Sequence, residues 1–301
     1  MKRKILSHLG EIEHLFDTFL FDAYGVFNFD SNVSQTAIDV MAQLVSQGKN
    51  VAILSNATYL SEDAAVRYSK KGVFQGIHYH KIITSGQFAH EDILQNKLPL
   101  SGKKVFVFGT ANFQKPENKV PGVFSGSDYE IVEDIDYADF VYCGIPQIDY
   151  KDKGVINEFI PLLAEIECRK LPMLCANPDL RAVEDGRFVV RQGLICSTYE
   201  DMMGKVVYYG KPDPRIFSRT LAELDVNNVE KVLMIGDTDR TDILGANRAG
   251  IKSCLILEQG VTADEMLARG IDLTYDNVEE FLAKKRYKAD FICKRLPALP
   301  L

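Results

Sequence analysis

Short apolar runs alternate with amphipathic, helix-like stretches along most of this chain. Each run but one ends in a polar cluster, and the runs occupy residues 18–22, 50–56, 81–85, 231–237, 252–257 and 271–276. Continuous apolar runs of this length are typical of parallel strands that are buried on both faces of a sheet. The stretches 34–47 and 61–71 each begin with a serine and are followed by a glycine, as helices often are. The pattern predicts an α/β fold with a Rossmann-like, doubly wound parallel sheet.

Three further segments depart from this alternation. Residues 5–16 carry a helical apolar stripe, and the basic tail 284–301 is expected to be a solvated, partly disordered end. Residues 99–204 have a strand–helix pattern of their own, which predicts a second α/β unit inserted into the first. The core domain is then discontinuous and consists of residues 1–98 and 205–301.

Composition and charge narrow the function class. The 301 residues carry a formal charge of −7, so the chain lacks the basic field of a dedicated nucleic-acid binder and no nucleic-acid partner is expected. No run of 18 apolar residues and no signal-peptide pattern is found, which predicts no membrane association and a cytoplasmic location. The six cysteines form no CxxC pair, and we interpret them as free thiols.

Carboxylates stand at the ends of two apolar runs. Asp22 ends the first run, and Asp237 ends the run that precedes Asp242. In parallel sheets, ligands bind at the carboxyl ends of the strands. Taken alone, Asp22 fits a nucleophile, a metal ligand or a cap of the following turn. Asp237 and Asp242, with Asp239 as a third acid between them, predict a site for a hard cation, since so much negative charge is costly without one.

Two other polar positions fit phosphate binding. Ser55 and Asn56 end the second run, where a hydroxyl and backbone N–H groups can hold phosphoryl oxygens. Lys211, ahead of two prolines, offers a compact positive charge for a phosphoryl group. Taken alone, the first pair also fits an ordinary turn, and the lysine also fits a surface position.

Together these motifs resemble the haloacid dehalogenase (HAD) superfamily, in which an aspartate, a Ser/Thr, a lysine and an acidic pair each follow a core strand. Only 33 residues separate Asp22 from Ser55, whereas 156 separate Ser55 from Lys211. The cap would therefore lie in the second interval. This spacing, with GKPDPRIF, GDTDRTDILGANRAGI and the segment CANPD at 175–179, is similar to that of the NagD-like subclass IIA phosphatases.

The resemblance implies a Mg²⁺-dependent hydrolase of a small phosphorylated metabolite, in which Asp22 forms an aspartyl-phosphate. Charge neutralisation and positioning dominate such phosphoryl transfer. The resemblance also allows a homodimer. Its implied site consists of catalytic Asp22 and Lys211, phosphate-binding Ser55, Asn56 and Lys211, metal ligands Asp22, Tyr24 (through its carbonyl), Asp237 and Asp242, and the cap residues Asn177, Asp179 and Arg181 toward the substrate.

Tyr24 departs from the family pattern. HAD phosphatases usually carry a second aspartate there as the general acid, and tyrosine is a poor replacement because its reference pKa is near 10. We therefore expect turnover mainly of substrates with good leaving groups. Two alternatives stay open. One is a binding relative with little or no catalysis. The other is a 2-haloacid dehalogenase, because FDAYG resembles the first motif of those enzymes and their leaving halide needs no proton.

Overall fold

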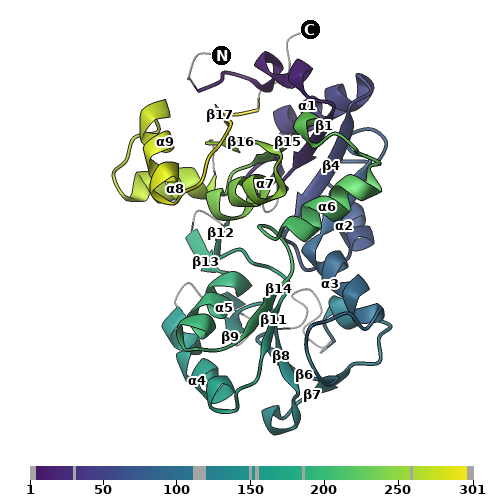
Figure 1. Ribbon diagram of the computed structural model, residues 1–301, viewed down its shortest axis with the longest axis vertical. Helices are drawn as coiled ribbons and strands as arrows, with labels where there is room; N and C mark the ends of the chain where they lie inside the picture. The colour runs from purple at the N-terminus through teal and green to yellow at the C-terminus, as the bar shows by residue number, and fades with distance from the viewer. Residues whose placement is uncertain are drawn as a thin grey trace. The chain divides into compact units, whose positions relative to one another are not determined.

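The computed structural model describes residues 5–29, 32–110, 120–148, 151–152, 156–184, 187–257 and 260–296. The chain forms two compact units (Figure 1). The first unit consists of Met1–Ser55, Glu62–Ile83 and Lys211–Leu301, and the second of Asn56–Ser61 and Thr84–Gly210. The domain boundaries inferred from the sequence stay a prediction.

The first unit is built on a six-stranded sheet in the order β17-β16-β15-β1-β4-β5. From β17 through β4, every neighbouring pair is parallel. The strands are β1 (Thr18–Phe21), β4 (Asn50–Ser55), β5 (Lys81–Thr84), β15 (Val232–Gly236), β16 (Lys252–Ile256) and β17 (Phe291–Cys293). The chain runs outward from β1 in one direction through β4 and in the other through β15. Ligands bind at such a switch point in open α/β sheets.

Local sequence explains the helices of this unit. The Ser34 side chain accepts a hydrogen bond from the Ala37 backbone N–H and so caps the first of them. Gly48, with φ +76°, follows the same helix. The helices are α1 (Gln35–Ser46), α2 (Ser61–Ser69), α6 (Pro214–Glu223), α7 (Leu244–Ala249), α8 (Val261–Ala268) and α9 (Tyr275–Lys284), with a π-helical turn η7 (Asp239–Ile243) and a small hairpin of β2 (Asn28–Phe29) and β3 (Asn32–Val33).

The second unit holds a five-stranded sheet in the order β14-β11-β8-β6-β7, with parallel neighbours throughout. Its elements are β6 (Lys104–Phe108), β7 (Glu130–Val132), β8 (Phe140–Cys143), β11 (Met173–Cys175), β14 (Val206–Tyr208), α3 (Ser85–Leu94), α4 (Ile160–Cys168) and α5 (Gln192–Asp201), with the hairpins β9 (Gln147–Ile148) and β10 (Lys151–Asp152), and β12 (Arg181–Glu184) and β13 (Arg187–Val190). Buried apolar residues from β8, β11, α4 and α5 form its core. The predicted α/β class, a Rossmann-like parallel sheet with a second α/β unit, is confirmed.

Three local predictions are wrong. Residues 5–16 form two 3₁₀ turns, Leu9–Glu11 and Glu13–Leu15, because the chain first pairs with β17 through the Leu6 N–H and the Ile292 carbonyl. The run 271–276 is not a strand, since Thr274 caps α9 by accepting from Asn277 N–H. The sixth strand, β17, lies instead in the tail that is expected to be solvated, of which residues 297–301 lie outside the described residues.

Short 3₁₀ turns also occur at Gly122–Phe124, Ile135–Tyr137, Ile156–Phe159 and Val229–Lys231. Among the described residues, no helix has both the length and the apolar character needed to cross a bilayer.

Candidate active site

The sheet brings Asp22 and Asp237 to the same edge. Phe21 of β1 is in register with Ile235 of β15, and the Asp22 backbone N–H donates to the Ile235 carbonyl at 2.8 Å. Asp22 and Asp237 therefore follow adjacent parallel strands directly. This arrangement follows from the strand ends that the sequence predicted.

Asp242 completes a cluster of three carboxylates. Asp22, Asp237 and Asp242 each offer an oxygen within 4.8 Å of the other two. Asp237 and Asp242 are buried, and Asp22 is nearly so. Burial raises the pKa of Asp242 to about 7 and holds that of Asp237 well above its usual range, where the neighbouring carboxylates add to the effect. The group thus has the hard oxygen donors that Mg²⁺ and Ca²⁺ prefer, and a divalent cation would relieve its mutual repulsion.

Lys211 lies against this cluster. Its ammonium is 2.6 Å from Asp22 Oδ1 and 2.8 Å from Asp242 Oδ1, and it donates to the Leu54 carbonyl of β4 at 2.8 Å. The side chain is 1% exposed. Because one ammonium offsets one carboxylate, three ionised carboxylates leave the site with a negative charge. The lysine that precedes two prolines in the sequence therefore lies beside the carboxylate cluster and not on the surface.

Two hydrogen bonds orient the Asp237 carboxylate. Its Oδ2 accepts from the Val261 N–H at the start of α8 at 2.7 Å, and its Oδ1 accepts from the Thr238 hydroxyl at 3.2 Å. A Cβ atom at Gly25 would lie 2.5 Å from its Cγ and one at Gly260 2.8 Å from its Cβ. Two glycines thus leave the space that this side chain fills.

Asp242 is fixed in a similar way. Its Oδ2 accepts from the Thr238 N–H at 3.0 Å. A Cβ atom at Gly236 would approach its Oδ2 to 2.2 Å. The close approach of the carboxylate therefore depends on a residue without a side chain at the end of β15.

Asp239 has a different partner from its two acidic neighbours. It is 1% exposed, and its Oδ2 pairs with Lys285 Nζ at 2.7 Å. The sequence argument that all three acids share one cation is thus corrected for Asp239. A buried carboxylate requires a partner, but nothing in the sequence pattern identified Lys285, 46 residues away.

The remaining residues of the core motifs occupy two different settings. Ser55 ends β4, is 2% exposed and lies beside the carbonyl of Leu54 that binds Lys211. Tyr24 follows β1 in a turn and is 40% exposed. Its backbone is bridged to Asn28.

The predicted cap residues form a local network within the second unit. The Asn56 amide donates to Asp179 Oδ1 at 2.9 Å, and the Asp179 backbone N–H donates to Asn177 Oδ1 at 3.0 Å. Asn56, Asp179 and Asn177 are thus brought together. Arg181 begins the hairpin strand β12 and is exposed.

Comparison with known proteins identifies the family. Models described as haloacid dehalogenase-like hydrolase match residues 19–120 and 155–250, and one described as HAD-hydrolase-like matches residues 208–296. The chain belongs to the HAD superfamily. The resemblance inferred from its motifs is thereby confirmed.

Individual relatives of this HAD protein agree with the family assignment. It is 24% identical over 248 residues to the ribonucleotide monophosphatase NagD of Escherichia coli (strain K12), covering 81% of this chain and 89% of NagD. It is 25% identical over 288 residues to the 4-nitrophenylphosphatase of Schizosaccharomyces pombe, covering 89% and 93%. These matches assign it to the NagD-like subclass IIA and make it a hydrolase of the phosphoric monoester type.

A solved structure has the same fold. A haloacid dehalogenase-like hydrolase from Brucella suis 1330 superposes with a TM-score of 0.79 at 22% identity, covering 97% of this chain and all of that one. The fold of the HAD protein is thus shared over nearly its whole length.

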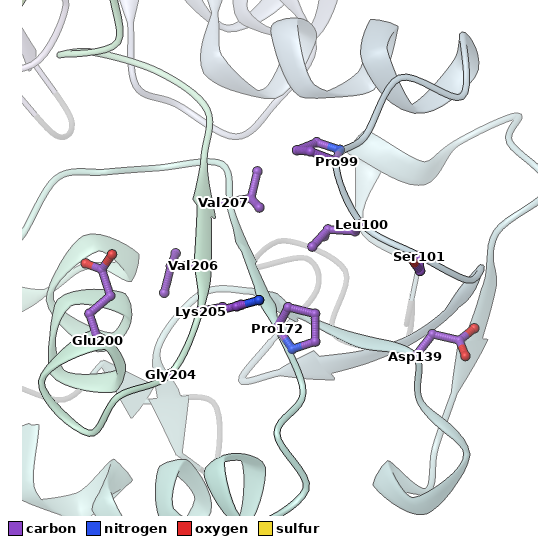
Figure 2. Close-up of a pocket in the computed structure, with 10 residues that line it drawn as sticks. All are labelled: Pro99, Leu100, Ser101, Asp139, Pro172, Glu200, Gly204, Lys205, Val206 and Val207. Carbon is purple, nitrogen blue, oxygen red and sulfur yellow. The ribbon is translucent and has the colours of Figure 1, made fainter.

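A cavity of about 600 Å³ lies in the second unit. Its lining includes Pro99, Pro172, Glu200 and the β14 residues Val206 and Val207 (Figure 2). None of the predicted site residues lines it.

Proposed function

We propose that this HAD hydrolase is a Mg²⁺-dependent phosphatase of a small phosphorylated metabolite and acts through an aspartyl-phosphate at Asp22. The observation that carries the proposal is the cluster of three carboxylates, two of which pair with the Lys211 ammonium. It combines a nucleophile, a hard-cation donor set and a fixed positive charge at the carboxyl ends of adjacent strands. Phosphoryl transfer depends on such positioning and charge neutralisation.

Each residue has a distinct role in this proposal. An Asp22 carboxylate oxygen attacks phosphorus, the ester oxygen leaves, and water then hydrolyses the acyl phosphate. Lys211 and the Ser55 hydroxyl, with the polar groups at Asn56, bind the phosphoryl oxygens. Asp22, Asp237 and Asp242, together with the Tyr24 carbonyl, hold Mg²⁺, which supplies charge neutralisation at the phosphoryl group.

The names of the relatives support the substrate class. One is a ribonucleotide monophosphatase and another a 4-nitrophenylphosphatase, so a small phosphate monoester is the proposed substrate here. Asn177, Asp179 and Arg181 are proposed to face its far end. The homodimer and the cytoplasmic location stay predictions.

Removal of metal tests the proposal. EDTA treatment is expected to abolish hydrolysis of 4-nitrophenyl phosphate, and excess Mg²⁺ is expected to restore it.

Binding of Mg²⁺ requires deprotonated carboxylates, and the Asp242 pKa is raised to about 7. Without metal, a carboxyl group with a raised pKa in the folded state makes the folded protein less stable as the pH rises through that pKa. Mg²⁺ should therefore raise the melting temperature more at pH 8 than at pH 6.

Two results would contradict this prediction. Hydrolysis that is unchanged by EDTA would exclude the metal-dependent mechanism. A melting temperature that does not respond to Mg²⁺ at pH 8 would exclude a cation site formed by Asp22, Asp237 and Asp242. Release of halide from a 2-haloacid without metal would favour the dehalogenase alternative.

A substitution at Gly25 tests the geometry around Asp237. Gly25 has φ +79°, and an added Cβ would lie 2.5 Å from the Asp237 carboxylate. Gly25→Ala should therefore displace this carboxylate and weaken Mg²⁺ binding by about tenfold. The overlap should also cost about 1–3 kcal/mol of unfolding free energy. Calorimetry and denaturant unfolding measure the two effects.

Gly48→Ala is the matched control for this variant. Gly48 has a similar φ of +76°, but an added Cβ would meet nothing within 4 Å. It carries the same backbone cost of about 1–2 kcal/mol without the overlap. If both variants bind Mg²⁺ equally well, Gly25 does not shape the site.

A further inference from the structure

The turn η7, which follows Asp237 and contains Asp242, is held by residues outside the motifs of the candidate site. Asp239, its first residue, pairs with Lys285 Nζ at 2.7 Å, just after α9. The same ammonium lies 3.2 Å from Glu265 Oε2 on α8 and 4.1 Å from the centre of the Phe281 ring. Lys285 is thus bound to the turn, to α8 and to its own helix.

The ion pair between Lys285 and Asp239 is largely buried. The Asp239 carboxylate is 1% exposed, and the Lys285 side chain is 18% exposed. The Asp239 backbone N–H donates to the Thr262 hydroxyl of α8 at 2.8 Å. Removing one member of a buried ion pair leaves an uncompensated charge, so the position of the turn depends on Lys285.

The same region of α8 also fixes a carboxylate of the cation site. The Val261 N–H donates to Asp237 Oδ2 at 2.7 Å, and the Thr262 N–H donates to the Asp237 carbonyl at 3.2 Å. Thr262 therefore contacts both Asp237 and Asp239. A shift of the turn relative to α8 would move two of the three carboxylates of the cation site, Asp237 before the turn and Asp242 within it.

We propose that Lys285 is a positioning residue for the divalent-cation site, acting through Asp239 on the turn that carries Asp242. This inference rests on the proposed function, because it assumes that Asp22, Asp237 and Asp242 bind Mg²⁺. Residues that orient metal ligands from outside commonly change metal affinity by about 10- to 100-fold when they are replaced. Lys285 touches neither the substrate nor the reacting atoms in this proposal.

The experiment measures Mg²⁺ binding by calorimetry to the full chain without substrate. Lys285→Met is expected to weaken Mg²⁺ binding by about tenfold, and the Mg²⁺ concentration for half-maximal hydrolysis should rise by the same factor. At saturating Mg²⁺, kcat should change less than about threefold. Lys285→Arg, which keeps the charge, should restore most of the affinity.

The adjacent lysine provides the matched control. Lys284 pairs with Glu280 at 2.7 Å, and both side chains are exposed. Lys284→Met removes the same charge from the same helix end and is expected to leave Mg²⁺ binding within about twofold of the parent, since surface ion pairs contribute little. Equal weakening in both variants would overturn the proposal, because it would reflect the field of the helix end rather than the contact to Asp239.

A double variant separates the loss of the ion pair from a loss of folding. Asp239→Asn combined with Lys285→Met leaves no unpaired buried charge and should fold, yet it removes the ion pair. It is expected to bind Mg²⁺ about tenfold more weakly than the parent; unchanged affinity overturns the inference. If the parent chain itself binds no Mg²⁺, the proposed function fails, and this inference fails with it.

Discussion

Replacing Asp22 by Asn is expected to lower kcat for 4-nitrophenyl phosphate on the order of 10⁴-fold or more, comparable to the loss of other enzymatic nucleophiles. The amide oxygen is a much weaker nucleophile than a carboxylate, so the aspartyl-phosphate would no longer form. The same change removes a charge from the ion pair with Lys211. Initial rates at saturating Mg²⁺ measure the effect.

An aspartate at the opposite end of β1, the strand that Asp22 follows, provides a control. Asp17 precedes β1 and lies 3.5 Å from the ammonium of Lys49, but its side chain is 67% exposed. Asp17→Asn is expected to change kcat less than about twofold, since such surface pairs contribute little. Should Asp22→Asn retain a tenth of the activity while its fold is intact, Asp22 is not the nucleophile.

Replacing Tyr24 by Asp is expected to raise kcat for an alkyl phosphate, such as glycerol 3-phosphate, by about 10²–10⁴-fold. A carboxylic acid at this position can protonate the leaving alkoxide and then accept a proton from water. For 4-nitrophenyl phosphate, whose leaving group needs no proton, we expect a gain of less than about tenfold. The Tyr24 side chain is 40% exposed, so the smaller residue leaves no buried cavity.

Tyr24→Asn separates the effect of an acidic group from the effect of a smaller side chain. It has nearly the volume of Asp but cannot donate a proton as an acid, so the alkyl phosphate should show no comparable gain. The variants are compared by the ratio of kcat for the two substrates. An equal gain for both substrates in Tyr24→Asp would mean that the side chain acts on binding or access rather than on the leaving group.

The core strands were predictable because their signal is local. Each of β1, β4, β15 and β16 is a continuous apolar run, and burial on both faces favours such runs whatever the rest of the chain does. Since side chains at the carboxyl ends of parallel strands meet, the positions of Asp22 and Asp237 followed from the same pattern. Lys211 needed the family motif as well, because a single lysine ahead of a proline has no structural signal of its own.

Predictions failed where a segment gains its structure from a distant partner. Strand β17 is only three residues long and lies in a basic tail, and it forms because β16 and the backbone of Leu6 pair with it. The N-terminal segment lost its predicted helix through the same contact. Residues 271–276 have a strand-like pattern, but the cap at Thr274 starts α9 instead.

The sequence by itself determined the superfamily and the parallel core sheet, and it singled out the carboxylates of the candidate site, since these depend on short apolar runs and on the residues that end them. Only the tertiary structure decided the partners of the carboxylates: Lys211 pairs with Asp22 and Asp242, Lys285 pairs with Asp239, and the Asn56 amide donates to Asp179. These pairs join residues up to 189 positions apart along the chain (211 − 22). Which charge meets which is fixed when helices and strands pack, because a buried carboxylate is stable only beside the donors that packing brings to it.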